Sequence, residues 1–248
     1  WFKSFGTEQS PGTKVVSVSG CVRRPGNYEV ELGVKTRDII YGLAGGPLEG
    51  HEIKAFYPGG SSSPVLTPEG LDLPYSFEAM AGAGSMLGSG SIIVADDTVS
   101  IPHMALRTAR FYHHESCGKC TPCREGTNWT VKMLERVVRG EATPMDLDII
   151  SSVQKNIMGH CLCVLGDSMA MPVSAMVNKF RPEFEEVIAS AAVSGFPTTD
   201  GREAQEDGEE PGPGGISPKV IERQRLAGRP VADGGDESTS GRATQDPT

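Results

Sequence analysis

The stretch HHESCGKCTPCREG, residues His113 to Gly126, contains three of the chain's six cysteines within seven residues. Cys117, Cys120 and Cys123 form two overlapping C-x-x-C pairs. One such pair is compatible with a redox dithiol, with half of a zinc site or with half of an iron–sulfur site. The residues around the stretch must therefore decide which chemistry it supports.

A redox dithiol is the weakest of these interpretations. Thioredoxin-type dithiols follow a strand, whereas the preceding segment, MALRTARFYHH (104–114), has a helical pattern. A two-electron dithiol also has no use for a third cysteine. Structural zinc sites usually combine two separate C-x₂-C knuckles. Three cysteines at i, i+3 and i+6 can instead bind three corners of a cubane cluster, so the spacing favours [4Fe–4S] and leaves zinc open.

The fourth ligand is expected in the stretch GHCLCVLGD (159–167). Cys161 and Cys163 are two residues apart, so in an extended segment their side chains point in opposite directions and only one can face the site. Spacing alone leaves that choice open. The positive charges of Lys119 and Arg124 are expected to raise the reduction potential of a bound cluster.

Residues 14–101 alternate β-rich runs with turns, which predicts a small α+β domain with β-grasp as a candidate topology. The strand-like runs are 14–20, 28–32, 51–57 and 91–101. One short helix is expected between them, capped by Thr36 and ended by Gly45 and Gly46. Cys21, in the turn after the first run, is expected to be a bystander thiol.

Residues 102–192 have helical periodicity, which predicts a small four-helix bundle with the cysteines at its helix ends. The predicted helices cover 104–114, 126–140, 143–158 and 168–191. Trp129 is expected in the bundle core. The third helix is expected to begin with Thr143 as its cap, Pro144 at its first position and Asp146 in its first turn.

Residues 193–248 are expected to be a disordered acidic tail, because apolar periodicity ends there. From residue 196 onward there are 11 acidic and 6 basic side chains, which account for −5 of the formal net charge of −9. This balance argues against a general nucleic-acid binder. No apolar run approaches the roughly 18–20 residues that span a bilayer. The uneven cysteine spacing is typical of an intracellular protein rather than of a secreted disulfide framework.

Several of these stretches together resemble the flavin-bearing F subunit of respiratory complex I, the proton-pumping NADH:quinone oxidoreductase. The cysteine motif is followed, after a helical hairpin, by GHCLCVLGD and KFRPEFEE. Upstream, VVSVSGCVRRPGNYEVELG, PGGSSSPVL and GSGSIIVADD resemble that family's SLBB domain, a soluble-ligand-binding β-grasp module. The resemblance covers about residues 1–190. Flavin subunits of NAD-linked hydrogenases and formate dehydrogenases share these modules and are close alternatives.

The resemblance implies a [4Fe–4S] cluster whose ligands are Cys117, Cys120, Cys123 and Cys163. Cys161 falls where the family often has a residue such as threonine. The implied activity is that of an NADH dehydrogenase, in which NADH passes a hydride to FMN and single electrons then pass through the cluster toward quinone. The resemblance implies no catalytic side chain within this stretch.

Residues 1–13 resemble the end of the family's N-terminal domain, so FMN and NADH are expected to bind in a preceding domain that is missing from this stretch. The implied partners are other subunits of the NADH-oxidising arm, including a [2Fe–2S] thioredoxin-like subunit and a multi-cluster subunit. The implied location is cytoplasmic, at the inner face of the membrane, with no nucleic-acid partner and no membrane span. A different class stays open, namely a zinc-stapled protein-interaction module.

Overall fold

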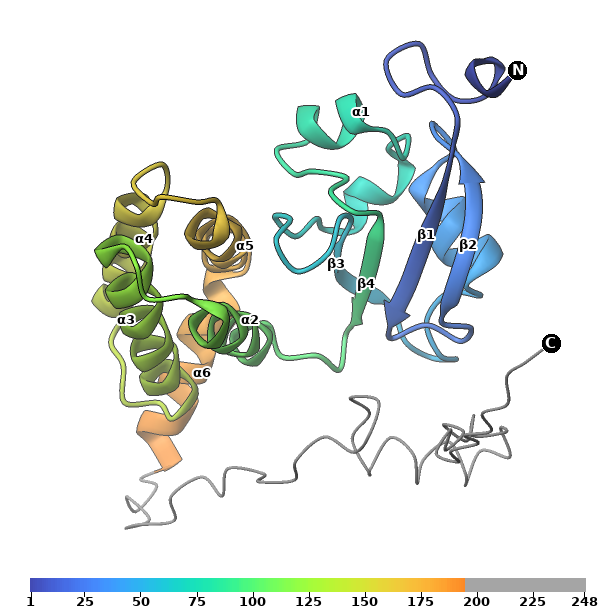
Figure 1. The fold of residues 1–248 in the computed structure, drawn as a ribbon. Helices are drawn as coiled ribbons and strands as arrows, with labels where there is room; N and C mark the ends of the chain where they lie inside the picture. Colours follow the sequence, from blue (N-terminus) through green and yellow to red (C-terminus); the bar gives the residue numbers. More distant parts are fainter. Residues whose placement is uncertain (195–248) are drawn as a thin grey trace, which may run out of the picture. The chain divides into compact units, whose positions relative to one another are not determined.

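The computed structural model describes residues 1–194 of the chain, with side chains to residue 190 (Figure 1). The predicted acidic tail from residue 195 onward lies outside the described residues. The described part combines one small mixed sheet with a set of helices, which confirms the predicted α+β class. None of the described helices is both long enough and apolar enough to cross a bilayer.

The sheet has four strands in the order β2-β1-β4-β3. Their bounds are β1 (Thr13–Gly20), β2 (Gly26–Glu31), β3 (Ile53–Tyr57) and β4 (Ser91–Asp96). β1 and β2 form an antiparallel hairpin, β1 pairs in parallel with β4, and β3 pairs antiparallel with β4. A hairpin whose first strand has the last strand as its parallel neighbour agrees with the predicted β-grasp topology. All four predicted strand runs are confirmed, although the last strand ends at Asp96.

The short helix before β3 differs from its prediction at the start. It is a π-helical segment, Asp38–Leu43, whose N-cap is Arg37. The Thr36 hydroxyl does not cap it and instead donates to the carbonyl of Leu73 at 3.1 Å. Its end follows the prediction, because Gly45 and Gly46 both adopt positive φ angles. The sequence reasoning also missed short elements: the 3₁₀ turns at Phe2–Ser4 and Pro68–Asp72, and the helix α1 (Phe77–Gly82).

Five helices follow the sheet: α2 (Ile101–Glu115), α3 (Thr121–Val138), α4 (Pro144–Ile157), α5 (Leu165–Lys179) and α6 (Arg181–Ser194). The stretch expected to be one last helix is therefore divided at Phe180. Pro182 explains the break, because proline lacks the N–H that would bond four residues back and its ring disfavours a continuous helix. α4 begins with the predicted cap, since Thr143 and Asp146 form a reciprocal capping box.

Trp129 is not in the bundle core, which corrects the prediction for α3. Its side chain lies on the surface, with 56% of the residue exposed. The buried stripe of α3 instead runs through Thr127, Thr130, Leu134 and Val137. Two small threonines thus occupy the places where α3 meets its neighbours, and the indole is rotated out of that interface.

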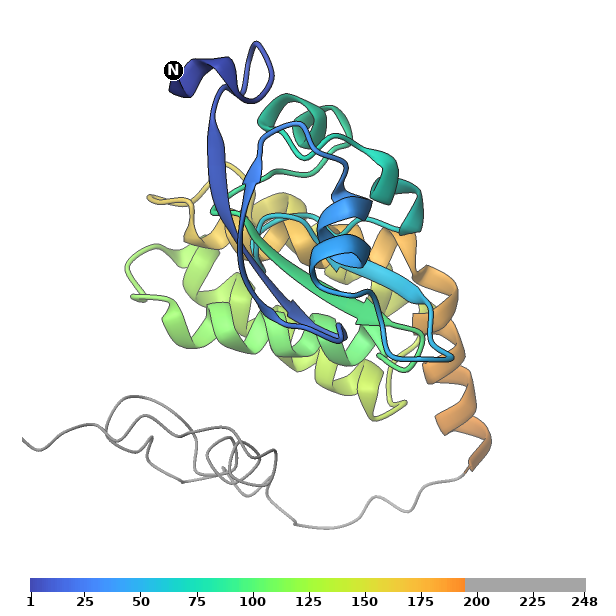
Figure 2. The same ribbon diagram turned by 90° about the vertical axis from the view of Figure 1, so that its right-hand side faces the viewer.

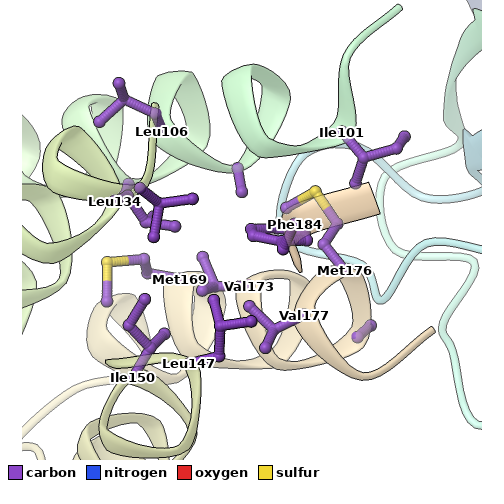
Figure 3. Close-up of a cluster of buried hydrophobic side chains, with 14 of the residues drawn as sticks. Ile101, Leu106, Leu134, Leu147, Ile150, Met169, Val173, Met176, Val177 and Phe184 are labelled. Atoms are coloured by element: carbon purple, nitrogen blue, oxygen red, sulfur yellow. The ribbon is translucent and has the colours of Figure 1, made fainter. Parts of the chain in front are cut away.

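One hydrophobic cluster joins the sheet to the helices. The two faces of β3 pack in different directions: Phe56 packs with the other sheet residues, whereas Ala55 and Tyr57 pack with the helices. The ribbon views show the helices α2 to α6 together on one side of the sheet (Figures 1 and 2). Figure 3 shows the helical side of this cluster, where Leu134, Met169 and neighbouring apolar side chains from α2 to α6 meet.

Polar contacts cross the same junction. The hydroxyls of Tyr57 and Thr108 lie 2.8 Å apart, and burial raises the pKa of Tyr57 to about 12. Lys179 Nζ donates to the carbonyl of Val65 at 2.8 Å. The helices are therefore fixed against the sheet by both apolar packing and buried hydrogen bonds.

Candidate iron–sulfur site

Three of the predicted ligands lie where α2 gives way to α3. Cys117 is exposed in the connecting loop, Cys120 is the half-buried N-cap of α3, and Cys123 is buried in the first turn of that helix. Pro122 occupies the first turn of α3, where a proline needs no backbone N–H. The irregular part is thus confined to five residues, 116–120, that join the helices.

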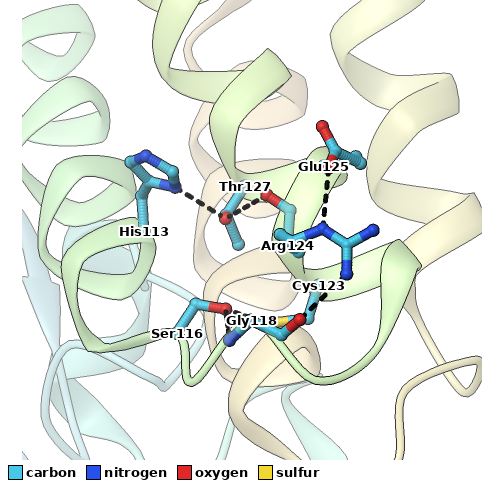
Figure 4. Close-up of polar contacts among 7 residues, drawn as sticks. All are labelled: His113, Ser116, Gly118, Cys123, Arg124, Glu125 and Thr127. Atoms are coloured by element: carbon cyan, nitrogen blue, oxygen red, sulfur yellow. Dashed lines mark hydrogen bonds and ion pairs between the residues drawn. The ribbon is translucent and has the colours of Figure 1, made fainter.

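Polar contacts hold this loop in place (Figure 4). Gly118 has a φ of +72°, a conformation that favours glycine, and its carbonyl accepts from Arg124 Nη1 at 2.9 Å. The Gly118 N–H donates to Ser116 Oγ at 3.3 Å, and that oxygen lies 3.2 Å from the sulfur of Cys123. Arg124 Nε pairs with Glu125 at 2.8 Å, so part of the positive charge expected at the site is neutralised.

The second cysteine segment connects α4 to α5. Cys161 is half-buried and Cys163 is exposed. In an extended segment the two side chains would point in opposite directions, but residues 161–163 form a bend. α5 packs closely on it, because a Cβ added at Gly166 would lie 2.5 Å from Cys161 Sγ. Because the segment bends, the side chains of Cys161 and Cys163 need not point in opposite directions.

The electrostatics connect the two cysteine segments. The backbone amide of Leu162 is the main cause that lowers the pKa of the Cys120 thiol. Burial is the main cause that raises the pKa of Cys123, and the negative charges of Cys120, Cys163 and Cys117 raise it further. Each of the four predicted ligands therefore takes part in one electrostatic group.

Cys161 belongs to the same group. Burial, followed by the neighbouring Cys120, raises its pKa to about 12, so this thiol strongly favours its protonated form. Its Sγ donates to the carbonyl of Ile157 at 3.5 Å. Cys21, by contrast, has Asp96 and Asp97 as its charged neighbours, in the sheet half of the molecule.

The donor set of the two cysteine segments consists of thiols, which is the ligand set of a [4Fe–4S] cluster. A tetrahedral zinc ion with Zn–S bonds of about 2.3 Å holds its sulfurs roughly 3.8 Å apart. Within residues 1–190, no three cysteine sulfurs all lie within 4.8 Å of one another; His51, Asp96 and Asp97 in the sheet are the group that meets this distance. An all-thiolate set occurs in both zinc and iron–sulfur sites, and three cysteines at i, i+3 and i+6 with a fourth from a distant loop follow the pattern of an iron–sulfur cluster.

Comparison with protein families identifies the two halves of the chain. Residues 103–187 match the model described as the NADH-ubiquinone oxidoreductase-F iron–sulfur binding region, a [4Fe–4S] region, and residues 15–66 match the SLBB domain. F subunit 2 of the NADH-quinone oxidoreductase of Rhizobium meliloti is 47% identical over 185 residues, which are 74% of this chain and 44% of the relative. The chain belongs to the family of NADH-quinone oxidoreductase F subunits.

Another member and a solved structure agree with this. The F subunit of the Streptomyces coelicolor NADH-quinone oxidoreductase is 44% identical over 76% of this chain and 42% of that protein. The chain thus spans less than half the length of these two curated relatives. The crystal structure of an NAD⁺-reducing [NiFe]-hydrogenase in the air-oxidised state superposes with a TM-score of 0.68 and 33% identity, covering 76% of this chain and 32% of the hydrogenase chain.

Two features of the cysteine segments were missed by sequence reasoning. Ser116 precedes the first cysteine directly, but nothing in the sequence indicates that its hydroxyl reaches Cys123. Gly166 follows the second cysteine group within the quoted stretch, and only the packing of α5 reveals why a side chain does not fit there.

Proposed function

We propose that the chain binds a [4Fe–4S] cluster through Cys117, Cys120, Cys123 and Cys163, and that it is the one-electron relay of an NADH-oxidising flavin subunit. The observation that supports this most is that thiols from two loops about 40 residues apart converge. The charges of Cys117, Cys120 and Cys163 all act on the thiol of Cys123. Cys161 is assigned no ligand role, because it falls where the resemblance to the F subunits places a residue such as threonine.

The protein's own groups are suited to an anionic site. Cys120 and Cys123 lie at the N-terminus of α3, where the helix dipole and its free N–H groups stabilise negative charge. Cys123 is buried, so water is largely excluded from that sulfur. Arg124 fixes the loop through its bond to Gly118.

A bound cluster would supply one-electron chemistry, which a flavin that receives two electrons together from NADH requires downstream. We place the FMN and NADH sites in the remainder of the longer subunit. The sheet half (14–101) and the helical half (102–192) are proposed as its SLBB and cluster-binding domains. The proposed partners are the [2Fe–2S] thioredoxin-like subunit and the multi-cluster subunit of the peripheral arm, at the cytoplasmic face of the membrane.

A second candidate is the flavin subunit of an NAD-linked hydrogenase. The superposition on the NAD⁺-reducing [NiFe]-hydrogenase, with a TM-score of 0.68, favours it. The cluster site would be the same in both cases. The subunits that co-purify with the chain from its host distinguish them, since a nickel-containing subunit would favour the hydrogenase.

Metal analysis tests the proposal directly. The full chain, loaded anaerobically with iron and sulfide, is expected to hold about four iron and four sulfide per chain and to give a cluster EPR signal after reduction. Stoichiometric zinc without acid-labile sulfide, in protein purified anaerobically from its host, would contradict it and favour a zinc-stapled interaction module.

A further inference from the structure

We propose that Ser116 is a positioning residue that raises the reduction potential of the cluster through a hydrogen bond from its hydroxyl to Cys123 Sγ. The inference rests on the proposed function and deepens it, because it assigns a role to a side chain that is not itself a ligand. The two atoms lie 3.2 Å apart, within hydrogen-bond range for a sulfur acceptor (Figure 4).

The direction of this hydrogen bond follows from which of the two residues has a proton to donate. A cysteine that binds iron does so as a thiolate and has no proton to donate. The serine hydroxyl has one proton and two lone pairs. The Gly118 N–H, 3.3 Å away, already donates to one of those lone pairs. The serine proton is therefore free to point at Cys123, and the serine must be the donor.

The backbone keeps the hydroxyl in this orientation. The Gly118 N–H donates to Ser116 Oγ at 3.3 Å, and Arg124 Nη1 holds the same residue by its carbonyl at 2.9 Å. The contacts thus run from Arg124 through Gly118 and Ser116 to Cys123 (Figure 4).

This hydrogen bond matters more than one at an exposed sulfur would, because Cys123 is buried. Cys123 is 5% exposed, whereas Cys117 and Cys163 are exposed to solvent. Water can donate to an exposed sulfur when a protein donor is lost, but it has little access to Cys123. In a poorly hydrated environment the Ser116 donor also acts more strongly.

The sign of the effect follows from charge. Reduction adds one negative charge to the cluster and its thiolates, and a donor at a sulfur stabilises the reduced state more than the oxidised state. Ser116 therefore raises the reduction potential. Its removal is expected to lower the equilibrium constant for reduction three- to tenfold, which is about 30–60 mV for one electron.

An EPR-monitored redox titration of the full chain, loaded anaerobically with iron and sulfide, tests this. Ser116→Ala is expected to retain iron and sulfide, but its equilibrium constant for reduction is expected to be three- to tenfold lower than that of the wild-type chain. Ser116→Thr keeps the donor and is expected to restore the wild-type potential. Ser168→Ala is the matched control, because that hydroxyl donates to the carbonyl of Val164 beside the site; its potential is expected to be unchanged.

The pair Ser116→Thr and Ser116→Val keeps the test decisive if the alanine variant does not hold its cluster. The two side chains have nearly the same shape and differ in the hydroxyl. A lower potential, or a lost cluster, in the valine variant alone supports the proposal. Equal behaviour of the two variants overturns it. A wild-type chain that binds no iron or sulfide would instead refute the proposed function.

Discussion

The two cysteine segments are held by different means. Residues 116–123 are fixed by polar contacts of their own, in which Ser116 and Arg124 bond to the loop backbone. Residues 158–163 depend instead on contacts with α5: Asp167 accepts a hydrogen bond from the Gly159 N–H at 2.8 Å, and α5 packs on the Cys161 thiol at Gly166. The geometry of the first segment is thus encoded locally, whereas that of the second depends on how α4 and α5 are placed. Changes to the second segment should therefore spread into the bundle.

The largest expected effect separates the two cysteines of the second segment. Cys163→Ser removes a proposed ligand and is expected to lose the cluster or convert it to a form with less iron. Cys161→Ser changes a neighbouring thiol that is not a proposed ligand and is expected to leave iron and sulfide contents unchanged. Metal and sulfide analysis with EPR measures both variants. If Cys161→Ser loses the cluster and Cys163→Ser keeps it, the ligand assignment is reversed.

A smaller effect is expected from Gly166→Ala, which tests the role of packing. The new Cβ would lie 2.5 Å from Cys161 Sγ and 2.9 Å from Ile157 Cγ2. Overpacking of this kind lowers the free energy of unfolding by about 1–3 kcal/mol. We also expect iron to be released faster to a chelator, because the second segment is displaced. Denaturant unfolding of the full chain and the release kinetics measure the two effects.

Gly82→Ala provides the matched control for that substitution. Gly82 also lies in a helix, but no atom lies within 4 Å of the Cβ it would gain. The variant is expected to be unchanged or up to about 1 kcal/mol more stable, because alanine favours helix. Equal losses of stability in the two glycine variants would show that the contact with Cys161 is not the cause.

The smallest expected effect comes from Asp146→Asn at the far end of α4, about 21 Å from the helix end that leads to the second segment. The Thr143 backbone N–H is the main cause that lowers the pKa of Asp146, so the carboxylate stabilises the fold when ionised. Because the folded pKa is depressed, this stabilisation is present above the unfolded pKa of about 3.9 and is lost as pH falls through the folded value.

Loss of this cap is expected to cost about 1 kcal/mol at pH 7. The difference in unfolding free energy between the variant and the wild type should be constant from about pH 5 to pH 8 and should shrink below about pH 4. Urea unfolding at several pH values measures it. The EPR spectrum of the cluster should not change, and a change would mean that α4 transmits strain to the second cysteine segment.

Periodicity and spacing predicted most of the architecture. Within β1 buried and exposed residues alternate, as Val16 and Val15 do, and the three cysteines of the first loop stand at the predicted junction of two helices. The position of Trp129 could not be predicted, because its place depends on two threonines that fit a tight helix contact. The bend at residues 161–163 likewise lies where α5 packs on Cys161, a contact that periodicity and spacing do not reveal.

The junction between the sheet and the helices has a consequence for the evolution of the two modules. Only residues 97–100 separate β4 from α2, and Tyr57 on the sheet lies against Thr108 on the helix in a common core. A split there would leave each half with an uncovered apolar face, so the two modules are expected to move between proteins as a single unit of genetic exchange. The match to the NAD⁺-reducing hydrogenase, which covers 76% of this chain, includes parts of both halves.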